Sequence, residues 1–424
     1  MSMLFRKYIV RTLGANMNVA IIGYGSRGEI YGDGFREHAK IVAVCDTKEE
    51  RLAYAEKKYA IHKDALYTDV NSFFAAGKLA DLCVVSTPDK LHYRHAIAAL
   101  KTGYDLLLEK PIACSVADCE EICAVANKLG RKIFVCHVLR YADFFSTIKR
   151  ELDTGEYGEI STINATENVA HWHYAHSYVR GNWHRAEDST PMIVAKCCHD
   201  LDLAVWYIGK PCIGISSMGS LRFFTEKNAP ADSTDRCVTC PHIKDCAYSA
   251  ERFYIGQIRA GNTDWPTNVL AIEPTEEKVR KAIENGPYGK CVFRCDNDVV
   301  DHQVVNMEFE GGATAHLTMT AFSDKQYREI AIHCEKGEIY GSTLDNLLHC
   351  YVFGKSNKVI NVTNEHNTSF GHGGGDHWLV SDIANYYEGR ASFGLTSIEN
   401  SIMSHKICFA AEESRLKGGV LVKP

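Results

Sequence analysis

The sequence predicts an α/β protein of two domains, with a doubly wound parallel sheet first and a large, mostly antiparallel open sheet second. Short apolar runs alternate with helix-period segments over residues 17–140, which is the pattern of right-handed βαβ units. Within residues 141–424, the segment VVNMEFEGGATAHLTMTA alternates apolar and polar side chains every two residues, which is typical of antiparallel strands. With 424 residues, 46% of them hydrophobic, the chain can form both cores.

Charge and apolar content exclude several classes of protein. The formal net charge of −6 gives no basic surface for nucleic acid or an anionic membrane, and no apolar run reaches the length of a membrane span. Most of the 17 cysteines lie inside apolar runs, which indicates a reducing cytoplasm rather than a disulfide framework. Residues 1–16 lack the apolar core of a signal peptide, so we expect an extension, or an artefact of the start codon, before Met17. A cytoplasmic protein with a small-molecule ligand is expected.

The first strand and helix meet at a glycine-rich turn, GYGSRG. Gly23 would allow the tight turn, Gly25 would let the backbone approach a pyrophosphate, and Gly28 would let the helix pack closely. Ser26 and Arg27 stand at the start of that helix, where backbone N–H groups favour phosphate. An ordinary glycine-rich turn is the alternative if nothing else supports a dinucleotide.

Support comes from the second strand, in KIVAVCDT, which ends at Asp46. A carboxylate at this distance from the glycines is placed to accept hydrogen bonds from the adenosine ribose. Its charge disfavours a 2′-phosphate, so NAD is preferred over NADP, although Arg27 and Lys48 are near.

The alternation continues and completes a Rossmann domain over 17–140. The expected elements are helix 48–60, strand 81–87, helix 91–103, strand 104–110, helix 115–130 and strand 132–138.

Three local patterns carry a resemblance to a known family: GYGSRG with Asp46, STPDKLHYRHA at 86–96, and LLEKPIA at 107–113. Together with the histidine-bearing segment at 193–208, they resemble the Gfo/Idh/MocA oxidoreductases, the family of glucose–fructose oxidoreductase and inositol dehydrogenase. The resemblance covers about residues 17–420.

The resemblance implies roles for the residues that follow the later strands. Thr87, Pro88 and His92 match the loop that runs along the cofactor, and Glu109 and Lys110 match the strand end beside the nicotinamide. Lys110 matches the active-site lysine of the family. Without the resemblance, a solvated lysine at a strand end would be the better interpretation.

The segment IVAKCCHDLDLAVW predicts one amphipathic helix over 193–208. Its buried side would carry Val194, Cys198, Leu201, Val205 and Ile208, and its polar side Lys196, His199, Asp200, Leu203 and Tyr207. A metal site fits poorly, because adjacent cysteines diverge around a helix and a lysine repels a cation. A solvated polar side stays an alternative.

By resemblance, His199 is the histidine that holds the reacting hydroxyl and acts as general base. Many family members carry an aspartate four residues earlier, where this chain has Ala195, and Lys196 stands beside it. The usual pair of acid and histidine is absent, so we expect a variant pocket with two lysines, Lys110 and Lys196.

The second domain is expected to begin with a helix ended at Gly155 and a strand in ISTINATENVA. The next segment, HWHYAHSYVRGNWHR, concentrates aromatic rings and donors suited to a polyhydroxyl substrate. The pocket candidates are Trp172, His173, His176, Arg180, Trp183 and Arg185. For any single one of them, an ordered surface loop with buried aromatics is the alternative.

A hairpin is predicted around Gly311 and Gly312, with one apolar and one polar face. In the family, such a sheet has helices on one face and often pairs subunits through the other. A homodimer or homotetramer is therefore implied by resemblance.

An insertion at about 225–296 contains the pattern RCVTCPHIKDC. Its thiols suggest a structural zinc, with free thiols as the alternative. The candidate ligands are Cys237, Cys240, Cys246 and Cys291, with Cys295 as the alternative fourth.

The C-terminal part has glycines around His372 and Asp376, followed by an apolar-periodic helix over about 396–416. Asp376 is interpreted as an N-cap, and His372 as a pocket candidate because neighbouring glycines would let a substrate approach.

These expectations combine into an NAD-dependent oxidoreductase that transfers hydride between nicotinamide and a secondary hydroxyl of a sugar, cyclitol or glycoside. His199 would take the hydroxyl proton, Lys110 would polarise the oxygen and Lys196 would assist. Two alternatives stay open. An NAD-dependent glycoside-cleaving enzyme would oxidise, eliminate and re-reduce with no net NADH, and a non-catalytic NAD-binding regulator would tolerate loss of Lys110 and His199.

Overall fold

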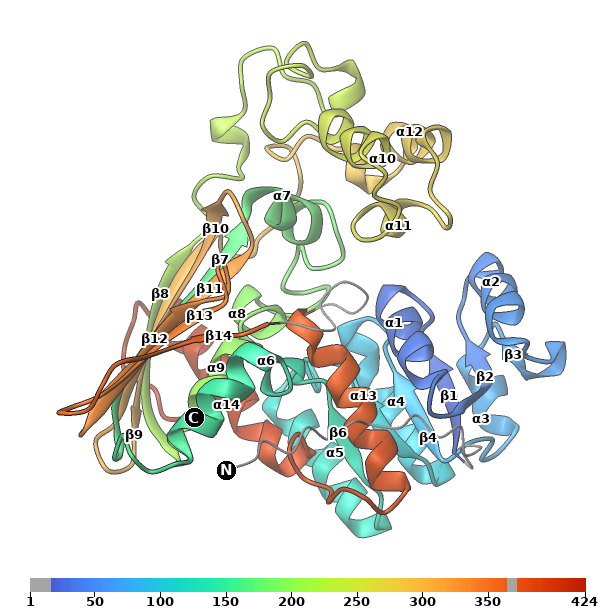
Figure 1. Ribbon diagram of the computed structural model, residues 1–424. Coiled ribbons are helices and arrows are strands. Elements are labelled where there is room, and N and C mark those ends of the chain that lie inside the picture. Colours follow the sequence, from blue (N-terminus) through green and yellow to red (C-terminus); the bar gives the residue numbers. More distant parts are fainter. Residues whose placement is uncertain (1–16, 364–371) are drawn as a thin grey trace.

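Two sheets, with helices packed on and between them, make up the part of the chain that the computed structural model describes, residues 17–363 and 372–424 (Figure 1). The predicted extension, residues 1–16, lies outside the described residues. None of the helices in the described ranges combines the length and apolar character that crossing a bilayer requires.

The first sheet is wholly parallel, with strand order β3-β2-β1-β4-β5-β6. Its strands are β1 Asn18–Ile22, β2 Lys40–Cys45, β3 Leu66–Tyr67, β4 Leu82–Val85, β5 Asp105–Leu108 and β6 Ile133–Val135. Its helices are α1 Ser26–Phe35, α2 Glu49–Tyr59, α3 Val70–Ala75, α4 Asp89–Thr102 and α5 Val116–Leu129. The order reverses between β1 and β4, where ligands bind outside the carboxyl ends of the strands. The predicted Rossmann fold is confirmed, and only the short β3 and α3 were not expected.

The second sheet is mixed, with order β14-β13-β12-β11-β7-β10-β9-β8. Its strands are β7 Ile160–Ala170, β8 Cys212–Ser220, β9 His302–Phe309, β10 Thr314–Ser323, β11 Tyr327–Cys334, β12 Gly337–Ser342, β13 Leu347–Val352 and β14 Lys358–Asn361. Only β7 and β10 pair in parallel, so the predicted mostly antiparallel sheet is confirmed. The predicted hairpin is β9–β10, with alternate side chains buried.

Helices of the second half connect the sheets. They are α6 Asp143–Leu152, α7 His171–Tyr174, α8 Met192–Ala195, α9 Cys198–Ile208, α10 Gly256–Arg259, α11 Thr267–Leu270, α12 Glu276–Asn285, α13 Gly375–Tyr387 and α14 Ile398–Leu416. Helix α14, the helix predicted at 396–416, packs on β8 and α9 and also on α5 of the first half. Helix α13 packs on α1, so the C-terminal helices return to the Rossmann half (Figure 1). The predicted division after residue 140 stays a prediction.

The single helix predicted over 193–208 is wrong. It is two helices, α8 and α9, because the chain leaves helical geometry at Lys196 and Cys197. The expected polar side is not solvated: Lys196, His199 and Asp200 are all buried. Helix α9 lies between α14 and the second sheet, so its polar residues face interior partners instead of water.

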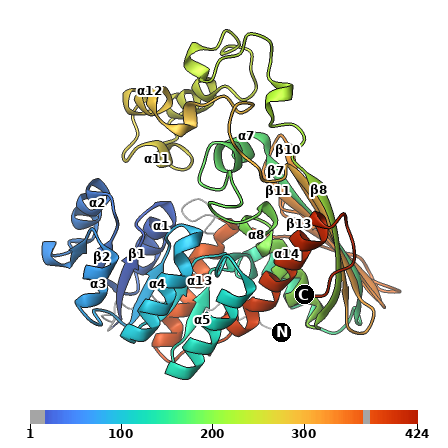
Figure 2. The same cartoon turned by 180° about the vertical axis from the view of Figure 1, so that it is seen from behind.

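The insertion leaves the second sheet after β8 and returns at β9. It contains α10, α11 and α12 and has a small core of its own, made of Cys237, Ala250, Tyr254, Ile255, Val279 and Ile283. Both views place it over the end of the molecule where α7 lies, with α11 between α7 and the Rossmann half (Figure 2).

Candidate functional site

The glycine turn after β1 has the geometry that its sequence predicts. Gly23 has φ +88°, and a Cβ there would lie 2.6 Å from the carbonyl oxygen of Ser86. A Cβ on Gly28 would lie 2.2 Å from the carbonyl oxygen of Gly23, so α1 can approach the turn only with glycine there. A Cβ on Gly25 would meet only the Arg51 guanidinium, at 3.5 Å. Space for a pyrophosphate therefore exists where α1 begins, at Ser26.

Asp46 ends β2 beside this turn, with its carboxylate held in place. The carboxylate accepts hydrogen bonds from the backbone N–H of Tyr24 at 2.8 Å and of Lys48 at 2.9 Å. Arg51 Nη1 lies 3.4 Å from it. A carboxylate acceptor at this strand end fits the hydroxyls of an adenosine ribose.

The loops after β4 and β5 are tied together by His92. Its ring nitrogens lie 2.7 Å from the carbonyl oxygen of Thr87 and 2.7 Å from that of Pro111. Pro88 is the N-cap of α4. These loops border the strand-order reversal, so His92 fixes the wall along which a dinucleotide would run.

Arg27 is engaged inside the protein. Its guanidinium pairs with Glu109 and with Asp376 and also contacts the Tyr31 hydroxyl. Burial would raise the pKa of Asp376, but Arg27 and His372 outweigh that effect and hold the pKa well below its usual range. The N-cap of α13 is Gly374, so the interpretation of Asp376 as an N-cap is wrong. This cluster joins the glycine turn to the strand end that carries Lys110.

Lys110 and His199 lie together at the carboxyl end of β5. The Lys110 amine donates a hydrogen bond to the carbonyl oxygen of Ala195 at 2.7 Å. His199 is buried, and neither ring nitrogen has a hydrogen-bond partner within the described ranges. Burial lowers the pKa of His199 well below its usual value, and the charges of Lys110 and His372 lower it further. The imidazole is therefore neutral.

Lys196 belongs to a buried network on the other side of His199. Its amine lies 3.3 Å from Glu167, whose carboxylate is 2.7 Å from Arg328, and Arg328 in turn is 2.6 Å from Asp200. Burial lowers the pKa of Lys196, against the attraction of Glu167. Gln326 links Glu167 to His173, with contacts of 2.5 Å and 2.9 Å.

Arg328→Met is expected to lower the free energy of unfolding by about 3–5 kcal/mol, because Glu167 and Asp200 would stay buried without their main partner. Urea denaturation measures the change. The exposed Arg36→Met serves as control, and adding Glu167→Gln to Arg328→Met should recover part of the loss. Equal stability of Arg328→Met and wild type would contradict this account of the network.

The six residues predicted to line the pocket fall into two groups of three. His173 lies on the site side, through Gln326, and burial together with Lys196 lowers its pKa. Trp172 stacks on Phe253 of the insertion at 5.2 Å between ring centroids. The indole N–H of Trp183 donates to Asp89 at 3.1 Å, at the start of α4.

The other three candidates make structural contacts. His176 contacts the Tyr254 hydroxyl at 2.7 Å, and Arg180 donates to the carbonyl oxygen of Lys290 at 2.7 Å. Arg185 pairs on the surface with Glu187 at 3.3 Å. The structure does not bring these three side chains to His199.

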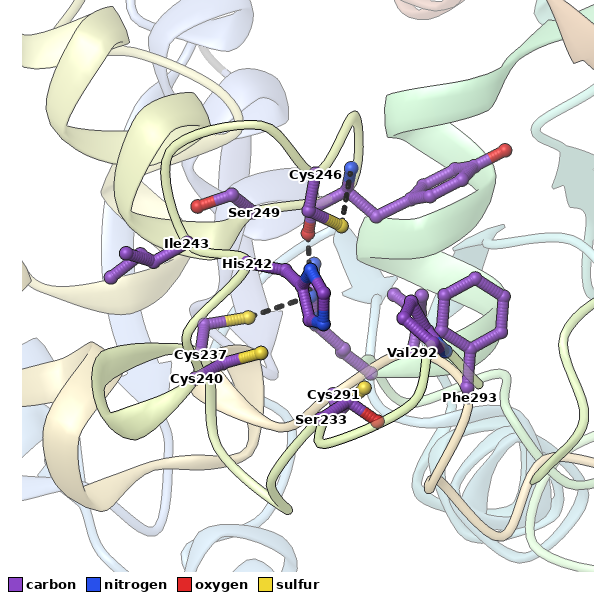
Figure 3. Close-up of a pocket in the computed structure, with 13 residues that line it drawn as sticks. Ser233, Cys237, Cys240, His242, Ile243, Cys246, Ser249, Cys291, Val292 and Phe293 are labelled. Atoms are coloured by element: carbon purple, nitrogen blue, oxygen red, sulfur yellow. Dashed lines mark hydrogen bonds between the residues drawn. The ribbon is translucent and has the colours of Figure 1, made fainter. Parts of the chain in front are cut away.

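The predicted structural zinc is not supported. Cys237, Cys240, Cys246 and Cys291 line one pocket (Figure 3). Across residues 17–363 and 372–424, however, no group of three or more His, Cys, Asp or Glu side chains is arranged to hold a metal ion.

Hydrogen bonds already engage two of these thiols. The Arg180 guanidinium donates to Cys237 Sγ at 3.5 Å, and the Tyr248 backbone N–H donates to Cys246 Sγ at 3.4 Å. A fixed positive charge beside the thiols opposes a second cation. Cys295 does not line the pocket, and its thiol donates to the carbonyl oxygen of Cys291 at 3.2 Å.

Sequence reasoning missed several residues of the site. Glu167 stood on the inward face of the strand pattern ISTINATENVA, and a carboxylate on a buried face was the available signal. Gln326, Arg328 and Trp265 carried no comparable pattern, since their place depends on contacts between distant segments.

Two family profiles match the chain. One, described as an oxidoreductase family with an NAD-binding Rossmann fold, matches residues 17–137, and the other, described as the C-terminal alpha/beta domain of that family, matches 149–419. The chain belongs to the Gfo/Idh/MocA oxidoreductase family. The predicted resemblance is confirmed, and the protein is an NAD-binding oxidoreductase of the dehydrogenase type.

Named relatives of this Gfo/Idh/MocA chain are distant. The provisionally assigned oxidoreductase YteT of Bacillus subtilis is 22% identical, over 82% of this chain and 83% of its own. D-glucoside 3-dehydrogenase of Escherichia coli is 28% identical over 35% of this chain and 42% of its own. Inositol 2-dehydrogenase of Salmonella typhimurium is 27% identical over 40% and 47%. The chain thus spans less than half the length of the last two.

Solved structures share the fold. An oxidoreductase from Agrobacterium radiobacter, in complex with NAD+, L-tartaric acid and magnesium, has a TM-score of 0.69 at 14% identity and covers 96% of this chain and 98% of its own. The WlbA dehydrogenase from Chromobacterium violaceum, in complex with NADH and UDP-GlcNAcA, has a TM-score of 0.67 at 17% identity, with 96% of each chain covered.

Proposed function

We propose that this protein oxidises a secondary hydroxyl of a sugar, cyclitol or glycoside, with NAD as the hydride acceptor. The observation that carries the proposal is the buried, neutral and unpartnered His199 beside Lys110, at the strand ends that border the glycine turn. An unsatisfied buried imidazole costs free energy unless a ligand supplies its hydrogen bond.

The residues divide the chemistry among them. The Lys110 amine donates a hydrogen bond to the substrate oxygen and stabilises the negative charge that develops there, while Ala195 fixes the amine by its carbonyl oxygen. One ring nitrogen of His199 accepts the hydroxyl proton. NAD, when bound, accepts the hydride from the carbon. His372 lies beside His199, with ring centroids 5.6 Å apart, and would donate to a neighbouring hydroxyl. Lys196, whose charge acts on His372, would assist.

The cofactor would be held by the residues around the glycine turn. Gly23, Gly25, Ser26 and Gly28 form the pyrophosphate turn, and Asp46 accepts from the ribose, which favours NAD over NADP. Thr87, Pro88 and His92 form the wall, and Arg27 with Glu109 holds the strand end in place. Hydroxyl-rich substrates in the names of distant relatives support the substrate class.

A second candidate is an NAD-dependent glycoside-cleaving enzyme with no net NADH. One observation favours it: Tyr288 of the insertion lies within electrostatic reach of Arg51, next to Asp46. The insertion thus reaches toward the residues proposed to hold the cofactor and would slow the exchange of NAD. A retained cofactor suits a reaction that regenerates it.

One experiment separates these functions. Purified protein with NAD is incubated with polyols, inositols and aryl glycosides while NADH absorbance and released aglycone are followed together. NADH with a polyol supports the dehydrogenase, and aglycone without NADH supports the glycoside-cleaving enzyme. If neither signal appears although NAD binds, and if Lys110→Ala and His199→Ala leave NAD binding unaffected, the non-catalytic regulator remains.

A homodimer or homotetramer through the uncovered face of the second sheet is part of the proposal. Tyr340 is 40% exposed on β12, on the opposite side from the buried Ile339, and stacks on His349 at 4.8 Å and Tyr351 at 5.8 Å. Light scattering of wild type and Tyr340→Glu tests it, and a monomeric wild type would refute it.

A further inference from the structure

Three aromatic rings from two distant segments form a platform beside the site. Trp172 of α7 stacks on Phe253 of the insertion at 5.2 Å and contacts Trp265, also of the insertion, at 5.4 Å. Trp265 directly precedes the turn into α11, which both views place between α7 and the Rossmann half. The aromatic platform, Trp172, Phe253 and Trp265, therefore exists only because the insertion folds back over α7.

The platform stays open to a ligand. Trp265 remains 38% exposed although it touches several rings, and Trp172 and Phe253 are only half-buried. Large aromatic surfaces that stay exposed in a cluster mark interaction sites more often than single exposed residues do. Trp172 stacks on both Phe253 and His173, and Phe253 packs against the core of the insertion. Trp265 therefore offers the exposed ring surface of the platform.

The platform is continuous with the reaction centre. The His173 ring lies edge-on to Trp265, with centroids 4.8 Å apart. His173 is electrostatically coupled to Lys196 and His372, and the ring of His372 is 5.6 Å from that of His199. A ligand that reaches from His199 past His372 and His173 therefore meets Trp265.

We propose that the aromatic platform binds the second ring of a glycoside, a sugar or aryl ring joined to the sugar that is held at Lys110 and His199. This inference rests on the proposed function and deepens it, since it names the substrate as a two-ring glycoside. Tryptophan faces suit both ring types, because an aryl ring stacks on them and the C–H face of a sugar packs flat against them. His173, at the edge, suits the hydroxyls of the same ring.

Binding by calorimetry, with NAD saturating, tests the proposal on the full protein. The probes are methyl and 4-nitrophenyl glycosides of a series of sugars. We expect the aryl glycoside of at least one sugar to bind about tenfold more tightly than its methyl partner, a difference of ~1.4 kcal/mol. Trp265→Ala should remove this preference, and Trp265→Phe should keep most of it. Phe353→Ala, an exposed aromatic far from α7, should leave it unchanged.

The outcomes distinguish this proposal from the proposed function. An aryl preference that persists in Trp265→Ala, or no aryl preference with any sugar, overturns the platform and leaves the oxidoreductase intact. A preference that depends on Trp265 but is accompanied by neither NADH nor aglycone supports the platform while the proposed function fails. Thermal denaturation of both Trp265 variants shows whether each is folded.

Discussion

Replacing Lys110 by methionine is expected to lower kcat by about 10³-fold while NAD still binds. Methionine keeps much of the side-chain volume but removes the donor that faces the developing negative charge on the substrate oxygen. Donors of this kind act mainly in the transition state, so the loss should fall on kcat rather than on KM. Steady-state kinetics gives both constants, and titration of intrinsic fluorescence with NAD gives the cofactor affinity.

The matched control is Lys90→Met, which removes an exposed lysine of α4 in the same half of the protein. Unchanged kinetics in the control assigns the effect to the Lys110 amine rather than to overall charge. A Lys110→Met protein with wild-type kcat would place the reacting oxygen away from Lys110 and would overturn its proposed role.

The cofactor-binding half of the candidate site could be predicted because short sequence motifs mark it. Gly28 is required by a contact within the turn itself, Gly23 by one with Ser86 after the adjacent strand β4, and Asp46 follows at a fixed distance. Each strand of the first sheet is an apolar run that can be recognised without knowing which strands lie beside it. The sequence therefore predicted the doubly wound parallel sheet, and the family resemblance added the expected place of Lys110 at a strand end.

The other half of the site depends on contacts that the sequence does not order. Lys196 was predicted to face the pocket from the polar side of one helix, with a solvated face as the alternative. It is buried because β7 brings Glu167 beneath it and β11 brings Arg328. Arg180 looked like a substrate donor by composition, but the insertion supplies carbonyl and thiol acceptors for it. Periodicity identifies a polar face without showing what covers it.

The His199→Gln variant should lose about 10²- to 10⁴-fold in kcat/KM, because no other group beside the substrate oxygen can take its proton. In the wild type, the pH dependence of kcat/KM also tests whether neutral His199 is the base. The folded-state pKa of His199 is lowered, so the neutral base persists as the pH falls through 6.5, and kcat/KM should decline only well below that value. An acid limb near 6.5 or above would contradict a buried, neutral base.

The charges around His199 make this profile specific. Lys110 and His372 lower its pKa after burial does, and His137 and Arg328 contribute in the same direction. Lys110→Met should therefore move the acid limb of the residual activity to higher pH, whereas a purely structural role for Lys110 would leave it in place. Because the lowered pKa makes protonation favour the unfolded chain, stability should be full above about pH 6.5 and fall on acidification.

In the proposed mechanism the two residues act on one oxygen, and this predicts how their losses combine. When Lys110 no longer stabilises the developing charge, proton transfer to His199 gains little, so the double variant Lys110→Met/His199→Gln should be scarcely slower than the worse single variant. Additive losses in log kcat/KM would instead mean that the two side chains serve separate steps or separate hydroxyls. The double-mutant cycle therefore tests whether the Lys110 amine and the His199 imidazole share the reacting oxygen, which is the central geometric claim of the proposed mechanism.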